Sequence, residues 1–193
     1  MNREYLLPTS FYENSNVVDA AQNLIGKVLC SNIDNFYTAG VIIETEAYCG
    51  RNDNACHAND GLRTKRTETM YGDPGLAYIY LCYGIHHLLN VVTNKNGLAD
   101  AVLIRAIRPL DGVETMIKRR GIASTKNLTN GPGKLTQALS VTTALNGTNL
   151  SKPPLWIEDR SITIKNSHIK RTPRIGVDYA GEHAKRPWRF LLD

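Results

Sequence analysis

The sequence predicts a single domain of the α+β class, with antiparallel strands and fewer helices. The chain of 193 residues suits one domain with a full hydrophobic core, and 42% hydrophobic with 21% charged residues is ordinary for a globular protein. Two pairs of β-prone runs, at 27–50 and 76–94, are each joined by turn residues, which is typical of β-hairpins. Segments with helical spacing lie before the first pair and after the second. We therefore treat residues 1–193 as one domain.

The first elements are a helix and a hairpin. Asn14 or Ser15 can cap a helix, and Gly26 can end it. Apolar residues follow at helical spacing: Val17, Val18, Ala21, Leu24 and Ile25. Residues 27–31 are expected to form a strand, 32–37 a turn, and 41–50 the returning strand.

The returning strand, VIIETEAYCG, carries the residues that suggest a reaction site. Side chains alternate between the two faces of a strand, so Ile42, Glu44, Glu46 and Tyr48 are expected to share one face. Two carboxylates and a tyrosine are out of place in a simple apolar core. We interpret this face as the centre of a functional site.

A long polar segment, 51–69, follows this strand. It carries His57 and a basic cluster, Arg63, Lys65 and Arg66. Long loops are often functional, but a solvated excursion explains the composition equally well. The four cysteines form no CxxC pair, so reduced thiols are expected rather than a metal site that includes His57.

The second hairpin is predicted from the β-prone runs on either side of Tyr83-Gly84. These two residues are expected at or near its tip. A regular strand would place Tyr80 and Tyr83 on opposite faces, and a turn or bulge at Gly84 would bring both to one site. A tyrosine at a tip either inserts into a partner or folds back on its own sheet, and the sequence leaves both open.

The remaining elements begin with a buried-looking strand over 101–107 that contains Arg105. A charge there requires a carboxylate or phosphate partner, and Glu44 or Glu46 could supply it, in a site or in a structural ion pair. We expect helices over 111–120 and 135–141, a hairpin of 155–158 with 161–164, and a short strand over 175–177. The turn before the second helix, with Gly133 and Lys134, is either a phosphate-binding helix start or an ordinary turn.

Composition and charge indicate the kind of partner only broadly. A net charge of +5 with a pI near 9.0 is compatible with a polyanionic partner. The chain starts without the layout of a signal peptide, and no apolar run approaches the ~20 residues of a membrane helix. We expect a soluble protein in the cytoplasm, associated with the nucleoid if the source is bacterial.

The chemistry-bearing residues fit several kinds of protein, and one of them is an enzyme that acts on a base in DNA. Such an enzyme needs aromatic rings to hold a flipped base, basic groups for phosphates, and a carboxylate to activate water. The chain also resembles the alkyladenine (3-methyladenine) DNA glycosylase family from about Leu24 to Phe190. The resemblance is carried, in order, by ETEAYCG with His57 eleven residues after Glu46, YIYLCYG, LIRAIRPL, GPGKLTQAL and PRIGVDYAGEHAKRPWRF.

The resemblance implies roles for individual residues. Glu46 matches the general base, Arg105 a residue that helps to hold the hydrolytic water, and the carbonyl of Ile175 a third contact of that water. Tyr48, His57 and Tyr80 match residues around the flipped base, where the His57 amide would donate to the base. The remaining matches are Asn90 against guanine, Tyr83 as the wedge that fills the gap in the stack, and Ile85 and His86 along the groove, with Gly133 and Lys134 as weaker candidates for DNA contact.

The resemblance also implies a fold and a reaction. The fold is a compact α+β domain with a curved antiparallel sheet, flanking helices and a protruding hairpin that inserts into DNA. The reaction is hydrolytic excision of alkylated or deaminated purines from double-stranded DNA, with no metal, no organic cofactor and no Schiff-base lysine. We expect a monomer, and we expect no partner-binding tail because the chain has almost no N-terminal extension.

Three other interpretations compete with this one. A helix-hairpin-helix glycosylase is suggested by Gly131-Pro132-Gly133-Lys134, although the sequence before Gly133 is rich in strands. A non-catalytic binder of damaged DNA would not need Glu46. A hydrolase of another glycoside could use Glu44 and Glu46 as a pair, because their roots are ~6.5–7 Å apart on a strand. In the favoured interpretation Glu44 has a structural role or orients Arg105.

Overall fold

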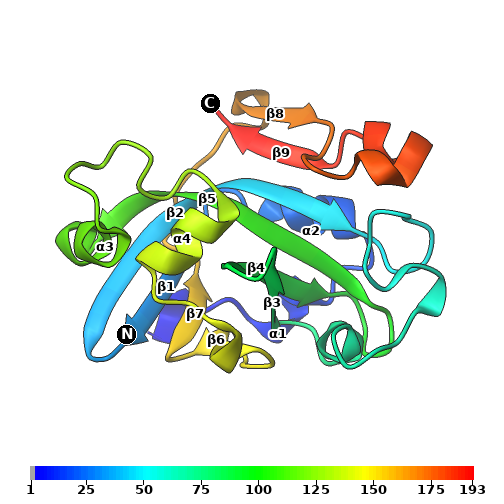
Figure 1. Cartoon of the computed structure of the whole chain (residues 1–193), viewed down its shortest axis with the longest axis horizontal. Helices are drawn as coiled ribbons and strands as arrows, with labels where there is room; N and C mark the ends of the chain where they lie inside the picture. Colours follow the sequence, from blue (N-terminus) through cyan, green and yellow to red (C-terminus); the bar gives the residue numbers. More distant parts are fainter. Residues whose placement is uncertain (1–2) are drawn as a thin grey trace.

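The computed structural model of the chain describes residues 3–193, and within them the strands form one antiparallel sheet (Figure 1). Its order is β3-β4-β5-β2-β1-β7-β6, and outside this order β9 pairs with β2 and β8 pairs with β9. The strands are β1 (Val28–Ile33), β2 (Phe36–Tyr48), β3 (Ala77–Cys82), β4 (His86–Thr93), β5 (Asp100–Asp111), β6 (Ser151–Lys152), β7 (Leu155–Glu158), β8 (Ile169–Thr172) and β9 (Arg189–Leu192). The α-helices are α1 (Thr9–Tyr12), α2 (Val17–Asn23), α3 (Val113–Arg120) and α4 (Pro132–Ala138).

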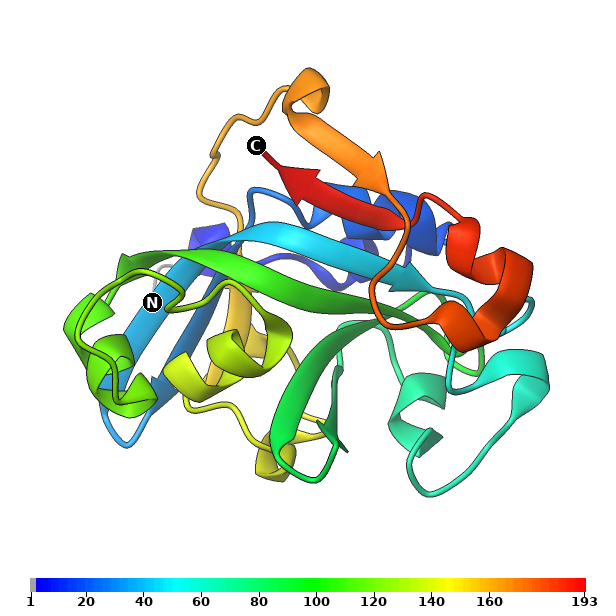
Figure 2. The same ribbon diagram turned by 45° about the horizontal axis from the view of Figure 1, so that its top comes forward.

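The sheet is curled into a half-barrel, which Figure 2 shows most clearly where β2 and β5 cross the molecule together. This confirms the α+β class and the curved antiparallel sheet. It also excludes the mostly helical architecture of the helix-hairpin-helix alternative. A protruding hairpin is not evident in this arrangement.

Strand β2 is the centre of the sheet. Its first half pairs with β1 through a tight turn at Asp34 and Asn35, both in the left-handed region at φ 55° and 61°. Its second half pairs with β9, and β5 lies along its other edge. The predicted turn at 32–37 is therefore too long, because two residues that tolerate positive φ suffice.

A bulge in β2 corrects the predicted alternation of side chains. The register with β5 shifts between Ile42 and Glu44, so Ile43 is an extra residue. Ile42 consequently lies in the main hydrophobic core, and only Glu44, Glu46 and Tyr48 turn toward the candidate site.

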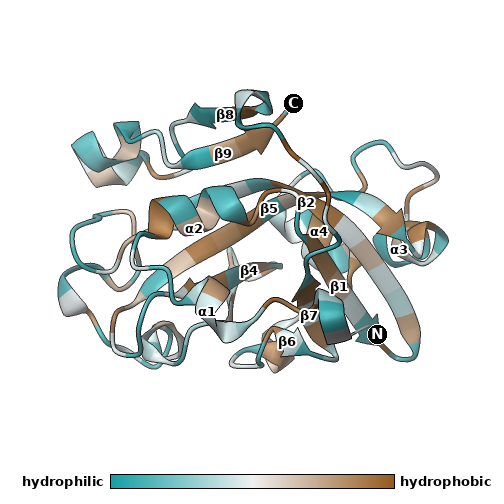
Figure 3. Cartoon of the chain, turned by 180° about the vertical axis from the view of Figure 1, so that it is seen from behind, coloured by the Kyte–Doolittle hydropathy of each residue, from teal (hydrophilic) through white to brown (hydrophobic). Residues whose placement is uncertain are grey.

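Helix α2 covers the core face of the sheet. Its cap is Asn16, not Asn14 or Ser15, because the Asn16 side chain accepts a hydrogen bond from the Val18 amide at 3.0 Å. Thr45 of β2 donates to the Ala21 carbonyl at 2.8 Å, which fixes the helix to the strand that carries the site. In Figure 3 apolar residues are concentrated on the strands and on one side of α2, while the loops are largely hydrophilic.

Several predicted boundaries in the second half differ from the structure. Strand β5 continues to Asp111, and α3 starts only after Gly112, which adopts φ 70° against the Tyr37 carbonyl, where a Cβ would clash. Helix α4 begins at Pro132, three residues before the predicted start, since proline suits a first helical turn.

Two predicted strands are wrong. Residues 161–164 form no strand, because both edges of β7 are already occupied, by β1 on one side and by β6 and a bridge from Leu6 on the other. Residues 175–177 are a loop, in which the Ile175 amide donates to a side chain rather than to a sheet partner. Strands β8 and β9 were not predicted.

Within residues 3–193, no helix has the length and apolar character needed to cross a membrane.

Candidate active site

The Glu46 carboxylate is held by donors from three parts of the fold. Its Oε2 accepts from the Tyr48 hydroxyl at 2.8 Å and from Arg105 Nη1 of β5 at 3.3 Å. Its Oε1 accepts from the Ile175 amide at 2.8 Å. The Glu46 side chain is fully buried, and these three residues lie around its carboxylate. A carboxylate enclosed in this way is fixed in both position and orientation.

Arg105 joins the two carboxylates that the sequence placed on one face. Its Nε donates to Glu44 Oε1 at 2.8 Å, and Arg189 Nε donates to the same oxygen at 2.6 Å. Burial alone would lower the pKa of Arg105, but Glu46 and Glu44 raise it above the ordinary value. Glu44 is thus bound to two arginines and orients Arg105 toward Glu46.

A buried ion pair connects the segment around Ile175 with the loop that carries His57. Arg174 donates to Asp53 Oδ1 at 2.7 Å and to the Ala47 carbonyl at 2.8 Å, and neither charged side chain is exposed. The guanidinium carbon also lies 4.8 Å from the centre of the Tyr48 ring. Residues 47–48, 53 and 174 are therefore held together beside Glu46.

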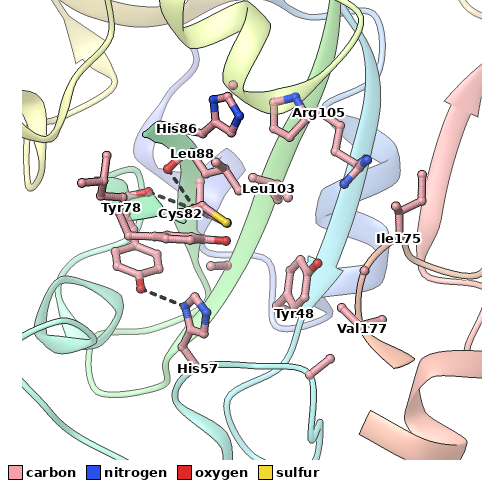
Figure 4. A pocket seen from close by; sticks show the side chains of 18 of the residues that line it. Tyr48, His57, Tyr78, Cys82, His86, Leu88, Leu103, Arg105, Ile175 and Val177 are labelled. Carbon is pink, nitrogen blue, oxygen red and sulfur yellow. Dashed lines mark hydrogen bonds between the residues drawn. The ribbon is translucent and has the colours of Figure 1, made fainter. Parts of the chain in front are cut away.

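A cavity of about 680 Å³ opens in front of this group. Figure 4 shows Tyr48 of β2 and Arg105 of β5 on one side of it, Tyr78 and His57 on another, and Ile175 and Val177 from the C-terminal segment. Tyr78 and Tyr80 lie with their ring centres 5.5 Å apart. Rings on several walls of one cavity can hold a planar heteroaromatic group by stacking.

The His57 ring is neutral and its tautomer is determined by its partners. Arg66 Nη2 lies 3.2 Å from His57 Nε2, and a guanidinium can only donate, so Nε2 is the acceptor. Nδ1 must then carry the proton that it donates to the Tyr78 hydroxyl at 3.0 Å. Burial and then Arg66 lower the pKa of His57 to about 4.

The tyrosines of the cavity stay protonated. Burial raises the pKa of Tyr78 to about 12 and raises that of Tyr80 further above its ordinary value. The pKa of Tyr48 is raised well above its ordinary value, first by burial and then by the Glu46 carboxylate. Their hydroxyls are therefore hydrogen-bond donors at neutral pH.

The tip of the β3–β4 hairpin carries exposed apolar side chains. Tyr83 is 91% exposed and Ile85 is 71% exposed, and Tyr83 also lines the mouth of the cavity. Tyr83 adopts φ 51° and Gly84 φ 73°, and the Ile85 amide closes the turn on the Cys82 carbonyl at 3.2 Å. The alternative in which Tyr83 folds back on its own sheet is wrong.

The other predicted site residues line the same cavity. Asn90 is buried and donates to the Tyr78 carbonyl at 3.1 Å. Gly133 packs so closely on the His86 ring that an added Cβ would lie 2.9 Å from it. Lys134 Nζ donates to Asn130 Oδ1 at 3.0 Å and remains at the rim.

Sequence reasoning missed four residues of this site. Asp53, Tyr78, Arg174 and Arg189 are not among the predicted site residues. The burial of Arg174 could not be predicted from the local sequence pattern, because its partner Asp53 lies 121 residues away in the chain. The one available signal for Tyr78 was its position in the same run as Tyr80, on the same face of a strand.

In the part of the chain that the structure describes, no group of three or more His, Cys, Asp or Glu residues could hold a metal ion.

An enclosed carboxylate beside an aromatic-walled cavity, with a protonated tyrosine and an arginine on that carboxylate, is a site suited to water activation and base stacking. The fold and site thus have the groups that a hydrolase acting on a bond to a planar base requires.

Comparison with known proteins gives the particular family. The model of the methylpurine-DNA glycosylase family matches residues 10–193, and the chain belongs to this family. It is accordingly a DNA glycosylase, a hydrolase of N-glycosidic bonds that acts in the repair of alkylated bases.

Relatives from bacteria and archaea match over nearly their whole length. A Chlamydia felis protein named "Putative 3-methyladenine DNA glycosylase" is 47% identical over 190 residues, which cover 97% of this chain and 96% of that protein. Proteins of the same name from Clostridium perfringens and Methanocella arvoryzae are 44% and 46% identical, over 96% of this chain and 95% and 91% of theirs. The resemblance found in the sequence motifs is confirmed.

Proposed function

We propose that this protein is a monofunctional glycosylase that flips a damaged purine out of duplex DNA and hydrolyses its bond to the sugar. Its proposed substrates are 3-methyladenine, 7-methylguanine, hypoxanthine and ethenoadenine. The observation that carries the proposal is the Glu46 carboxylate, enclosed by Tyr48, Arg105 and Ile175 at the wall of the cavity. Residues 1–193 would act as one glycosylase domain and as a monomer.

The hydrogen bonds of Glu46 suggest where the hydrolytic water binds. Oε2 already accepts two bonds, whereas Oε1 accepts one, from the Ile175 amide. A carboxylate oxygen has two acceptor sites, so the free one is on Oε1. The water would sit there, beside Ile175, and the half-exposed Ile175 segment would shift to admit it because the carboxylate is otherwise enclosed.

The walls of the cavity would hold the flipped base. Tyr48, His57 and Tyr80 would pack around it, and Asn90 would crowd the exocyclic amino group of guanine. Tyr83 would protrude from the tip of its hairpin into the space that the base leaves. Secondary DNA contacts are proposed for four residues that lie on or beside the same hairpin: Ile85, His86, Gly133 and Lys134.

The variant Glu46→Gln tests this proposal. It keeps the size of the side chain but removes the base that accepts the water proton, so single-turnover release of 7-methylguanine should fall by about 10²–10⁴-fold. Abasic sites revealed by alkali would measure release, and a panel of duplexes with each of the four lesions would define the substrates. Glu114→Gln is the matched control, because Glu114 is exposed on α3.

The outcomes separate the competing functions. Lesion binding with no base release in Glu46→Gln supports the proposal. Full base release in the variant would remove Glu46 from its role. An unmodified protein that binds lesion duplexes but releases no base would instead be a binder of damaged DNA. An unmodified protein that hydrolyses another glycoside with equal dependence on Glu44 and Glu46 would be the paired-carboxylate hydrolase.

A further inference from the structure

Arg66 is a cation at the end of the cavity formed by His57 and Tyr80, and within residues 3–193 it has no carboxylate partner. It is exposed on the loop after β2 and lines the cavity, with its guanidinium carbon 4.7 Å from the centre of the Tyr80 ring and Nη2 3.2 Å from His57 Nε2. Among residues 3–193 no carboxylate lies within ion-pair distance of it, whereas Arg63 on the same loop pairs with Glu68. His57 and Tyr80, which Arg66 contacts, are both proposed contacts of the flipped base.

The Glu46 carboxylate and the Arg66 cation therefore lie at different ends of the site. Glu46 lies on the side of Arg105 and Ile175, and Arg66 lies with His57 and Tyr80. The field of Arg66 is felt in the cavity, since burial together with Arg66 lowers the pKa of His57. A base held between these groups would have the Glu46 carboxylate, with Arg105 bound to it, toward its sugar and the Arg66 cation toward its far edge.

Glycosidic hydrolysis moves charge along this direction. When the bond between C1′ of the sugar and the base nitrogen breaks, both electrons of the bond stay on the base, while the water oxygen bonds to C1′ and its proton passes to Glu46. A cationic 7-methylguanine leaves as a neutral base, and neutral hypoxanthine leaves as an anion that then takes a proton from solvent. In both cases the charge of the base falls by one unit.

We propose that Arg66 is a further catalytic residue, which stabilises the electron pair that develops on the departing base. A fixed cation favours the transition state over the bound substrate in both cases, because the substrate base is one unit more positive than the leaving base. This assignment rests on the proposed function, since it requires the base to occupy the cavity. A residue that only binds the DNA backbone would not have this effect on the rate of base release.

The test compares three variants under single-turnover conditions with enzyme in excess. Arg66→Gln removes the charge but keeps an N–H donor for His57, Arg66→Lys keeps the charge, and Lys65→Gln removes the same charge from the neighbouring residue, which does not line the cavity. Each is assayed on duplexes with 7-methylguanine and with hypoxanthine. Binding is measured to a duplex with a tetrahydrofuran abasic analogue, which has phosphates but no base.

We expect Arg66→Gln to slow release of both bases by about tenfold, which is less than the 10²–10³-fold reported for enclosed oxyanion donors because Arg66 is exposed. Arg66→Lys should recover part of the rate, Lys65→Gln should match the unmodified protein, and tetrahydrofuran binding should not change. Weaker tetrahydrofuran binding with an unchanged release rate would show a phosphate contact and overturn the proposal. So would an unchanged rate in Arg66→Gln while Glu46→Gln is inactive, whereas an active Glu46→Gln would refute the proposed function itself.

Discussion

At the scale of single residues, the orientation of Glu46 depends on two side chains that do not line the cavity, Arg174 and Asp53. The Ile175 amide that donates to Glu46 follows Arg174 in the chain, and Arg174 is tied to Asp53, to the Ala47 carbonyl and to the Tyr48 ring. A shift of Arg174 would therefore move two of the three groups that enclose the carboxylate. The buried ion pair couples the stability of the fold to the geometry of the site.

Replacing Arg174 should be costly for stability. Arg174→Ala leaves the fully buried Asp53 carboxylate without its cation, and uncompensated buried charges cost about 3–5 kcal/mol. We expect urea unfolding to show a loss of that size. Lys170→Ala is the control, because it breaks an exposed pair with Asp193 that should contribute no more than about 1 kcal/mol. Equal losses in the two variants would contradict this account of the buried pair.

The sequence predicted those site residues whose chemistry conflicts with their local pattern. Glu46 and Arg105 are charges inside apolar strands, and Tyr83 is an aromatic beside a turn glycine, so each stands out without any alignment. Arg174 and Arg66 do not stand out, because they occur in polar segments where cations are common. Only the fold shows that Arg174 is buried and that Arg66 lies over the Tyr80 ring.

At the scale of elements, the β3–β4 hairpin keeps its apolar tip in a strained conformation. Tyr83 adopts φ 51°, a region that residues with a Cβ occupy at a cost of roughly 1–2 kcal/mol. A glycine would adopt it without that cost. An exposed tyrosine in this position therefore lowers the stability of the isolated protein, which fits a function of Tyr83 in the complex with DNA.

The variant Tyr83→Gly separates stability from function. We expect its free energy of unfolding to be unchanged or raised by up to ~1 kcal/mol, because the strain is relieved. Its affinity for lesion duplexes should fall by roughly 5–150-fold, which corresponds to ~1–3 kcal/mol of lost stacking. Urea unfolding and fluorescence anisotropy measure the two quantities, with Tyr83→Phe as a control that keeps the ring. Lesion affinity that survives the loss of the ring would exclude Tyr83 as the wedge.

The elements that could be predicted are those specified by neighbouring residues. The β1–β2 and β3–β4 hairpins follow from alternating apolar runs with turn residues between them. Strands β8 and β9 could not be predicted in this way, because IKRT is polar and its apolar partner RFLL lies 16 residues after it. Residues 161–164 have a strand-like pattern but no free edge to pair with, which only the tertiary arrangement determines.

At the scale of the whole molecule, the C-terminal strand completes the site strand. β1 pairs with β2 only as far as Val41, and β9 takes over that edge at Glu44–Glu46 (Figure 2). Phe190 of β9 pairs with Thr45 and is fully buried in the main core, while Arg189 binds Glu44. The last strand is therefore part of the same packed unit as α2 and the β1–β2 hairpin.

This arrangement predicts that the end of the chain unfolds together with the rest. Phe190→Ala should lower the free energy of unfolding by about 3–5 kcal/mol, because it leaves a cavity among α2, β2 and β9. Phe190→Leu fills most of that space and should cost clearly less. In both variants far-UV circular dichroism and base-release activity should be lost at the same urea concentration. If β8 and β9 were instead a separable arm, activity would disappear at a lower urea concentration than the circular dichroism signal, and Phe190→Ala would shift only the activity transition.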